Sequence, residues 1–336
     1  MNKTIDWRLL KKLYAIHSPS GKEDKMIAFL VSYLKSLPGV KLGRDSYGNL
    51  YAWKGESETY PCIVAHLDQV QRNHPRDFRA IETRDIIFGY SAKEHSICGL
   101  GADDKNGIII CLEAIKKYDC MKVVFFKEEE TGCHGSSRAE MKFFEDCRYV
   151  IQCDRRGNSD LITNIGCSDL CSEKFIQDID PEKWGYKEET GMMTDVEALK
   201  ERGLSVSAIN MGCGYYNPHT DEEITVKRDL EKCWHLVQHI IEDCAETYPH
   251  EVGDNACFGY DEWEIEDEIH SIIQQDPTMT ASDLYDMYQT NYPMLRLEDF
   301  ERIVSDHQLW YDDEEETLTQ TFKPDGKETD KEDFIF

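Results

Sequence analysis

Apolar runs recur along the chain, and segments with helical periodicity lie between them. Four runs have the length and composition of buried strands: 61–68, 121–126, 148–154 and 204–212. Apolar residues spaced three and four apart predict helices over 106–118, 193–203 and 226–246. Continuous apolar strands that alternate with helices are typical of parallel sheets covered on both faces. We therefore predict an α/β fold with a largely parallel, mixed central sheet and helices on both faces.

Two further segments complete this part of the chain. Residues 1–16 form an amphipathic helical pattern, with Asp6 and a lysine pair where a signal peptide needs an apolar core. Segment 71–98 has the pattern of an antiparallel excursion before the Asp103 loop. No apolar run approaches the roughly 20 residues that span a bilayer, so we predict no membrane partner.

The pattern changes near residues 250–260, where the last long helix is broken. Beyond it, helical patterns over 264–276, 280–292 and 297–310 predict a small acidic helical appendage, residues 255–322, followed by a charged tail, 323–336. The formal net charge is −28, and residues 251–336 hold 25 acidic and 5 basic residues. Such an acidic segment argues against nucleic acid as a partner.

The chain contains 13 cysteines, an odd number, and most of them lie inside apolar strand or helix patterns. A disulfide framework is therefore not predicted, and a reducing, cytoplasmic environment fits better. No C-x-x-C pair occurs, so a thiolate zinc module is not supported.

Residue types that bind metals gather at the ends of the predicted strands. In open α/β sheets, ligands bind at the carboxyl ends of the strands. The candidate positions, in chain order, are His66 and Asp68 in "AHLDQV", Asp103 and Asp104 in "GADDKNG", Glu128, Glu129 and Glu130 in "EEETG", Asp154 in "CDRRG", and His219 in "GYYNPHTDEE". Each motif also has an ordinary structural interpretation: a strand-end histidine, a helix N-cap, a solvated acidic loop, a turn aspartate or a loop histidine.

Together, the order His-x-Asp, Asp-Asp-Lys, Glu-Glu, Asp, His resembles the co-catalytic di-zinc exopeptidases. The pattern is most similar to the peptidase T and aminoacylase-type group, whose clan includes the lidless zinc aminopeptidases. The resemblance covers roughly residues 60–225. It implies a peptidase catalytic domain over residues 1–250 that binds two divalent metal ions. Zinc is the family's metal, and cobalt or manganese suits the same ligands.

The resemblance also implies a role for each motif residue. The metal ligands would be His66, Asp103, Glu130, Asp154 and His219, with Asp103 bridging both ions. Asp68 would orient His66, and Glu129 would be the general base that activates a metal-bridging water. The three anionic ligands carry −3 against +4 from two cations, which explains why carboxylates crowd at this position. Glu223, four residues past His219, would support the site from the following helix. Glu128 has no assigned role: solvation and binding of a substrate ammonium remain open.

The sequence departs from the peptidase T group in one respect. That group inserts a lid domain of about a hundred residues between the aspartate and the last histidine, whereas Asp154 and His219 are only 65 positions apart. The chain therefore resembles a catalytic domain without the lid, and other residues must stabilise the oxyanion. The candidates are Tyr215, Tyr216, His74, His95 and Arg155.

These observations predict a metal-dependent exopeptidase, either an aminopeptidase or a di/tripeptidase, that acts on short peptides. One alternative keeps the machinery but changes the substrate to an acylated amino acid, making the chain an N-acyl amino acid amidohydrolase. The other is a non-catalytic binding or scaffold protein with the same fold. That alternative predicts a lost ligand or base, and every predicted ligand is present in the sequence.

Overall fold

The computed structural model describes residues 5–71, 74–166, 168–252 and 279–288, together with residues 297, 300 and 304. The chain divides into two compact units, residues 1–259 and 260–336. Each unit is described by itself.

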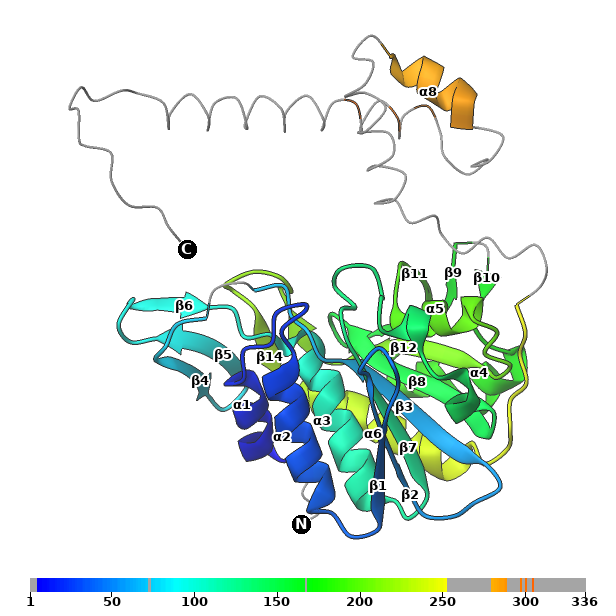
Figure 1. Cartoon of the computed structure of the whole chain (residues 1–336), viewed down its shortest axis with the longest axis horizontal. Coiled ribbons are helices and arrows are strands. Elements are labelled where there is room, and N and C mark those ends of the chain that lie inside the picture. Colours follow the sequence, from blue (N-terminus) through cyan, green and yellow to red (C-terminus); the bar gives the residue numbers. More distant parts are fainter. Residues whose placement is uncertain are drawn as a thin grey trace, which may run out of the picture. The chain divides into compact units, whose positions relative to one another are not determined.

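A nine-stranded mixed sheet forms the centre of the first unit (Figure 1). Its strands, in spatial order, are β1 (Val40–Arg44), β2 (Leu50–Lys54), β7 (Met121–Phe126), β3 (Tyr60–His66), β8 (Cys147–Arg155), β12 (Ala208–Gly212), β9 (Asp160–Ile165) and β10 (Ser168–Asp169), with β11 (Lys187–Gly191) also paired to β9. The central strands β7, β3, β8 and β12 are mutually parallel, and the outer pairs β1–β2, β2–β7 and β9–β12 are antiparallel. The predicted α/β class with a mostly parallel mixed sheet is confirmed.

Alternation along each strand divides the core into two layers. In β3, Ile63 and Ala65 pack in one apolar cluster, whereas Cys62 and Val64 pack in the other. The first cluster includes the buried faces of α1 (Trp7–Tyr14), α2 (Asp24–Lys35), α3 (Ala102–Lys117) and α6 (Lys227–Asp243), and the second includes that of α5 (Asp195–Glu201). Because every residue of β3 is buried, the strand reads as a continuous apolar run.

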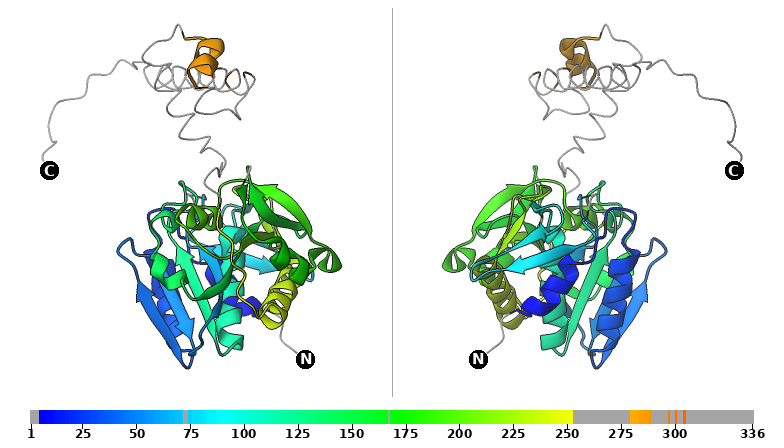
Figure 2. Two further views of the ribbon diagram at one scale, coloured as in Figure 1. Left: turned by 90° about the vertical axis from the view of Figure 1, so that its right-hand side faces the viewer. Right: turned by 90° about the vertical axis from the view of Figure 1, so that its left-hand side faces the viewer.

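Segment 71–98 forms strands, but they belong to a second sheet (Figures 1 and 2). This five-stranded antiparallel sheet contains β4 (Phe78–Glu82), β5 (Ile86–Ser91), β6 (Ser96–Cys98), β13 (Tyr215–Tyr216) and β14 (Ile224–Val226). The antiparallel strands expected for this segment are therefore present, and they form a sheet separate from the main one. The pairing of β5 with β14 brings it beside the segment that carries His219.

The remaining helices differ from prediction mainly at their ends. The N-terminal pattern forms α1, which Asp6 caps by accepting from the amides of Arg8 and Leu9. Helix α4 (Glu173–Ile179) was not predicted, and its cap is Ser172. Among the described residues of this unit are also three short 3₁₀ turns: Ser136–Arg138, Met141–Phe144 and Pro181–Trp184. None of the described helices is long and apolar enough to cross a membrane.

In the second unit, the structure describes α8 (Ala281–Tyr288), which falls within the predicted helix 280–292. Its start has reciprocal capping, because the Thr280 hydroxyl accepts from the Asp283 amide (3.2 Å) and the Thr280 amide donates to the Asp283 carboxylate (3.0 Å). The helix predicted for 264–276, nearly all of 297–310 and the tail 323–336 lie outside the described residues.

Candidate metal centre

The main sheet brings three predicted strand ends together. Strands β7, β3 and β8 are adjacent and parallel, and the register pairs His66 with Phe126 and Val64 with Gln152. His66 at the end of β3 is therefore level with Asp154 near the end of β8. Glu129 and Glu130 follow the end of β7 by three and four residues. Parallel strands thus place these side chains at one edge of the sheet.

The Asp103 carboxylate lies between the two histidines. Asp103 is at the start of α3, and its Oδ1 lies 3.0 Å from Nε2 of His66, which is 1% exposed. Its Oδ2 lies 3.4 Å from Nε2 of His219, on the loop between β13 and β14. Glu130 Oε2 is 3.1 Å from the same nitrogen of His219. The two oxygens of the Asp103 carboxylate therefore face two different imidazole rings.

Two further carboxylates face His66 Nε2. Asp154 Oδ1 is 3.6 Å away and Glu129 Oε2 is 3.9 Å away. On the other side of the ring, Asp68 Oδ1 lies 3.4 Å from Nδ1. The structure thus brings together all seven residues predicted as ligands, base or orienting group.

The Asp68 carboxylate also accepts hydrogen bonds from the backbone after β7 and from Ser20. Its Oδ1 accepts the amide of Glu129 (3.0 Å), and its Oδ2 accepts the amide of Glu130 (3.2 Å) and the hydroxyl of Ser20 (2.7 Å). The predicted role covered only the contact with His66. The sequence contained no signal for the contacts with Ser20 and the two amides, since they depend on tertiary structure.

Charge and burial shift the proton equilibria in the cluster. Burial disfavours a charged His66, but Asp154, Glu129 and Asp103 outweigh it and raise its pKa well above the usual value. Burial also opposes ionisation of Asp103, yet hydrogen bonds with His219 and His66 lower its pKa.

The other carboxyl groups shift in the opposite direction. Burial raises the pKa of Glu129 well above its usual value, against the effect of His66, and the charge of Asp154 raises it further. Burial and the charge of Asp103 raise the pKa of Glu130. Crowded buried carboxylates of this kind require positive charge to ionise together.

The donor set fits divalent cations. Ligand atoms of His66, Asp103 and Glu130 lie within 4.8 Å of one another, as do those of His66, Asp104 and Asp154. Among the described residues, Glu130 Oε1 is one of the few buried side-chain atoms without a hydrogen-bond partner. Asp104 is committed elsewhere, because its oxygens accept the amides of His66 and Gly107. Asp103 is therefore better placed than Asp104 to contact both groups of ligand atoms.

The motifs did not reveal a second layer of buried polar groups. Gln152 Nε2 donates to Asp154 Oδ2 (3.1 Å) and Asp195 Oδ2 (3.2 Å). Asn210 accepts from the Asp154 amide (2.9 Å), and its own amide donates to Thr194 (3.0 Å). Burial raises the pKa of Asp195 to about 6. The only available signal was a glutamine and an asparagine inside apolar strands.

Glu223 supports the start of α3. Its Oε1 accepts the Asp103 amide (3.1 Å), and its Oε2 accepts the Gly101 amide and the side-chain amide of Gln71. The carboxylate therefore holds the backbone on both sides of Ala102. Glu223 makes these contacts from the position just before β14, so the expectation that it lies on the helix was wrong.

The five candidates for oxyanion contacts have different surroundings. The Tyr215 hydroxyl donates to Asp154 Oδ1 (3.3 Å), whereas Tyr216 donates to Asp229 (2.8 Å). His74 stacks on His17 and contacts the ring of Phe78 at a tilt, and His95 lies in the exposed β5–β6 turn. Arg155 follows Asp154 and has a buried Nε without a hydrogen-bond partner. Of the five, Tyr215 is the one with a recorded hydrogen bond to a predicted ligand.

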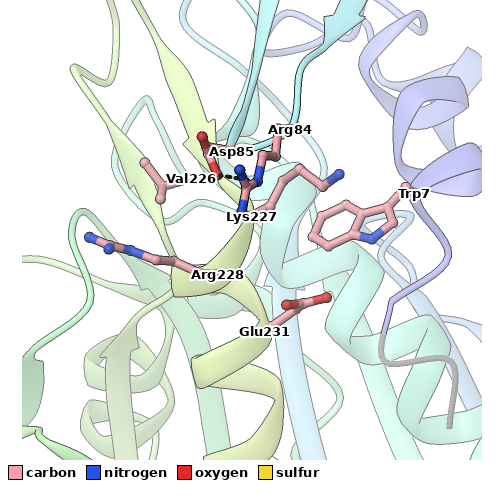
Figure 3. A pocket seen from close by; sticks show the side chains of 7 residues that line it. All are labelled: Trp7, Arg84, Asp85, Val226, Lys227, Arg228 and Glu231. Carbon is pink, nitrogen blue, oxygen red and sulfur yellow. Dashed lines mark ion pairs between the residues drawn. The ribbon is translucent and has the colours of Figure 1, made fainter. Parts of the chain in front are cut away.

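A cavity of about 390 Å³ lies at the start of α6 and contains none of the predicted site residues. Figure 3 shows its lining from three segments: Trp7, Arg84, Asp85, Val226, Lys227, Arg228 and Glu231. Its cations are already paired, Lys227 with Glu82 (2.8 Å), Arg228 with Asp229 (3.2 Å) and Arg84 with Asp85 (3.9 Å). Because none of the lining residues belongs to the histidine–carboxylate cluster, the cavity is separate from it.

Comparison with solved structures identifies the fold. Aminopeptidase PepT from Bacillus cereus matches with a TM-score of 0.57 and 16% identity over 72% of this chain and 100% of its own. The chain therefore shares the α/β fold of this aminopeptidase. A tripeptidase from Staphylococcus aureus (TM-score 0.57, 14% identity) matches over 71% of this chain and 98% of its own. An aminopeptidase from the archaeon Desulfurococcus kamchatkensis (0.55, 16%) matches over 71% and 95%.

These likenesses are structural only. No protein-family model matches the sequence, and no curated protein is significantly similar to it. At identities of 14–16%, the likeness shows the fold alone, because one fold can carry different chemistry.

Proposed function

We propose that this chain is a metal-dependent exopeptidase, either an aminopeptidase or a di/tripeptidase. The observation that carries the proposal is the position of Asp103 between His66 and His219, with Glu129 3.9 Å from His66. The peptidase fold supports it, since the solved structures that share this fold include aminopeptidases and a tripeptidase.

The ligands divide into two overlapping sets. His66, Asp103 and Asp154 would hold one divalent cation, and Asp103, Glu130 and His219 would hold the other. Nitrogen and carboxylate donors suit zinc, and also cobalt or manganese. Such ions, when bound, supply Lewis acidity, which polarises a carbonyl group and makes a water molecule more acidic.

The residues of the chain then supply the proton transfers. Glu129 is nearly buried, 8% exposed, and its Oε2 faces His66. It accepts the proton of the attacking water and passes it to the leaving amine, as a general base and then a general acid. Asp68 contacts the His66 ring and accepts the amides of Glu129 and Glu130. It therefore fixes the position of the base, Glu129, relative to the ligand His66.

The test uses the purified full chain supplied with zinc or manganese. Amino-acid amides, dipeptides, tripeptides and N-acyl amino acids are assayed side by side, and bound metal is measured by mass spectrometry. We expect turnover of substrates with a free amino terminus. Glu129→Gln should lower kcat about a thousandfold with metal content unchanged, because the amide cannot accept the proton. Glu145→Gln, at an exposed position, is the control and should keep full activity.

The alternatives predict other results. Turnover of N-acyl amino acids alone would identify an amidohydrolase. A protein that binds two metal ions but hydrolyses none of these substrates would be a non-catalytic member of the fold, and the proposal would be wrong.

A further inference from the structure

The loop that carries Glu129 and Glu130 closes on itself. The Gly135 amide donates to the Lys127 carbonyl (2.9 Å), and the His134 amide donates to the Glu128 carbonyl (3.0 Å). Residues 127–135, named here the base loop, therefore leave the end of β7 and return to the same place. Two non-glycine residues in it have positive φ, Glu128 (55°) and Cys133 (49°). Such conformations persist only where the surroundings hold them.

Lys127 and Gly135, the first and last residues of the base loop, are named here its neck. One side chain from outside the loop binds both of them. Asn49, which is 0% exposed, accepts the Lys127 amide with its Oδ1 (3.1 Å) and donates to the Gly135 carbonyl with its Nδ2 (2.9 Å). The contact is close, since a Cβ added to Gly135 would lie 2.6 Å from Asn49 Oδ1. Asn49 precedes β2, whose pairing with β7 places it beside the neck.

Hydrogen bonds to Asp45 hold the turn that presents Asn49. Asp45 Oδ1 accepts the amides of Tyr47 (3.0 Å), Gly48 (2.8 Å) and Asn49 (3.0 Å). Its Oδ2 accepts the side-chain amide of Asn49 (2.7 Å) and the hydroxyl of Tyr51 (2.7 Å). An aspartate that bonds its own following amides stabilises a turn locally.

The same turn makes a second contact with the base loop. The Tyr47 hydroxyl donates to the carboxylate of Glu128, the residue next to the general base. Lys127 Nζ lies 3.9 Å from the other oxygen of Glu128. The carboxylate of Glu128, the first of the three glutamates, is therefore already paired with side chains of this chain.

We propose that the turn Asp45–Asn49 is a positioning element that holds Glu129 in place, through Asn49 at the neck of the base loop and Tyr47 at Glu128. Asn49 contacts the loop backbone and none of the predicted ligands, so it acts through the loop. The activity part of this inference rests on the proposed exopeptidase function. The geometric part does not.

The experiment compares Asn49→Ala with Leu34→Ala, a fully buried position in α2 away from the site. Both changes destabilise the chain, so measurements are made well below both melting temperatures. Hydrogen exchange is followed at the amides of Glu129 and Glu130, which donate to Asp68. Kinetics and bound metal are measured on the same samples.

For Asn49→Ala we expect exchange at these two amides to accelerate at least tenfold, and kcat to fall roughly 10- to 100-fold with KM within about threefold. Metal content should remain that of the parent. Leu34→Ala should change neither kcat nor the local exchange beyond about twofold. Tyr47→Phe removes one hydroxyl from a half-buried ring, and should give a smaller change in the same direction even if Asn49→Ala does not fold.

Parent-like exchange and kcat in the variants that fold would overturn the inference. So would an equal loss in Leu34→Ala, because the effect would then follow global stability. If the parent chain hydrolyses no peptide, the exopeptidase proposal fails, and the exchange data still decide whether the turn holds the base loop.

Discussion

At the scale of single residues, Asp68 does more than its position in the motif suggests. One carboxylate lies 3.4 Å from His66 and accepts three hydrogen bonds, from two amides of the base loop and from Ser20. It therefore joins a predicted ligand, the predicted base and the segment before α2. An ionised carboxylate suits this position because all of its partners are donors.

Replacement of Asp68 by asparagine keeps the shape but turns one acceptor into a donor. We expect kcat/KM to fall roughly 10- to 100-fold, because either His66 or the amides of the base loop lose their acceptor. Steady-state kinetics with metal analysis measures the effect. Ser20→Ala removes one of the hydrogen bonds only and should cost less. Parent-like activity of Asp68→Asn would show that these contacts do not orient the site.

At the scale of elements, the start of α3 is built around a buried carboxylate. Asp104 accepts the amides of His66 (3.2 Å) and Gly107 (2.8 Å), which attaches the helix to the end of β3. Gly107 leaves the space for that carboxylate, since a Cβ there would lie 2.7 Å from Asp104 Cγ. The helix therefore needs glycine here for space rather than for an unusual φ.

Gly107→Ala should destabilise the chain by about 2 kcal/mol, because the pinned Asp104 side chain cannot move aside without losing its hydrogen bonds. Gly203→Ala is the matched control. At that position φ is +87° and nothing lies within 4 Å of the added Cβ, so only the backbone cost of about 1 kcal/mol applies. Denaturant unfolding measures both. An equal loss in the two variants would contradict the steric argument.

At the scale of the whole molecule, we expect stability to depend on an ionisable pair outside the histidine–carboxylate cluster. Lys200 on α5 donates to the carbonyls of Val206 and His250 and lies 3.0 Å from His250 Nδ1. Burial and the Lys200 charge lower the pKa of His250 to about 4. In the unfolded chain this pKa is about 6.5.

The unfolded state therefore binds more protons at His250 between pH 6.5 and 4, so this contribution to stability is lost as pH falls through that range. His250→Asn, which keeps an acceptor for Lys200, should remove that part of the pH dependence. The ring is only half-buried, so we expect the stability difference between parent and variant to change by about 1 kcal/mol from pH 7 to pH 4. Urea unfolding across this range measures it, with the exposed His235→Asn as control. A constant difference would contradict the assignment.

Local patterns were sufficient for the core strands. Residues 121–126 were predicted as a strand, and β7 has the same bounds. The run 204–212 was predicted too long, because β12 begins at Ala208 and Val206 forms only an isolated bridge with Pro249. The second sheet escaped prediction, since the pairing of β5 with β14 joins segments more than 130 positions apart.

The sequence by itself determined the α/β class, the alternation of buried strands and helices, and the residue types at the strand ends, because periodicity and strand-end chemistry are local properties of a chain. Only the tertiary structure decided how these groups face one another. It placed Asp103 between two histidines, Asp68 under three donors and Asn49 at the neck of the base loop. Those relations depend on strand order and register, which are set by packing between residues far apart in sequence.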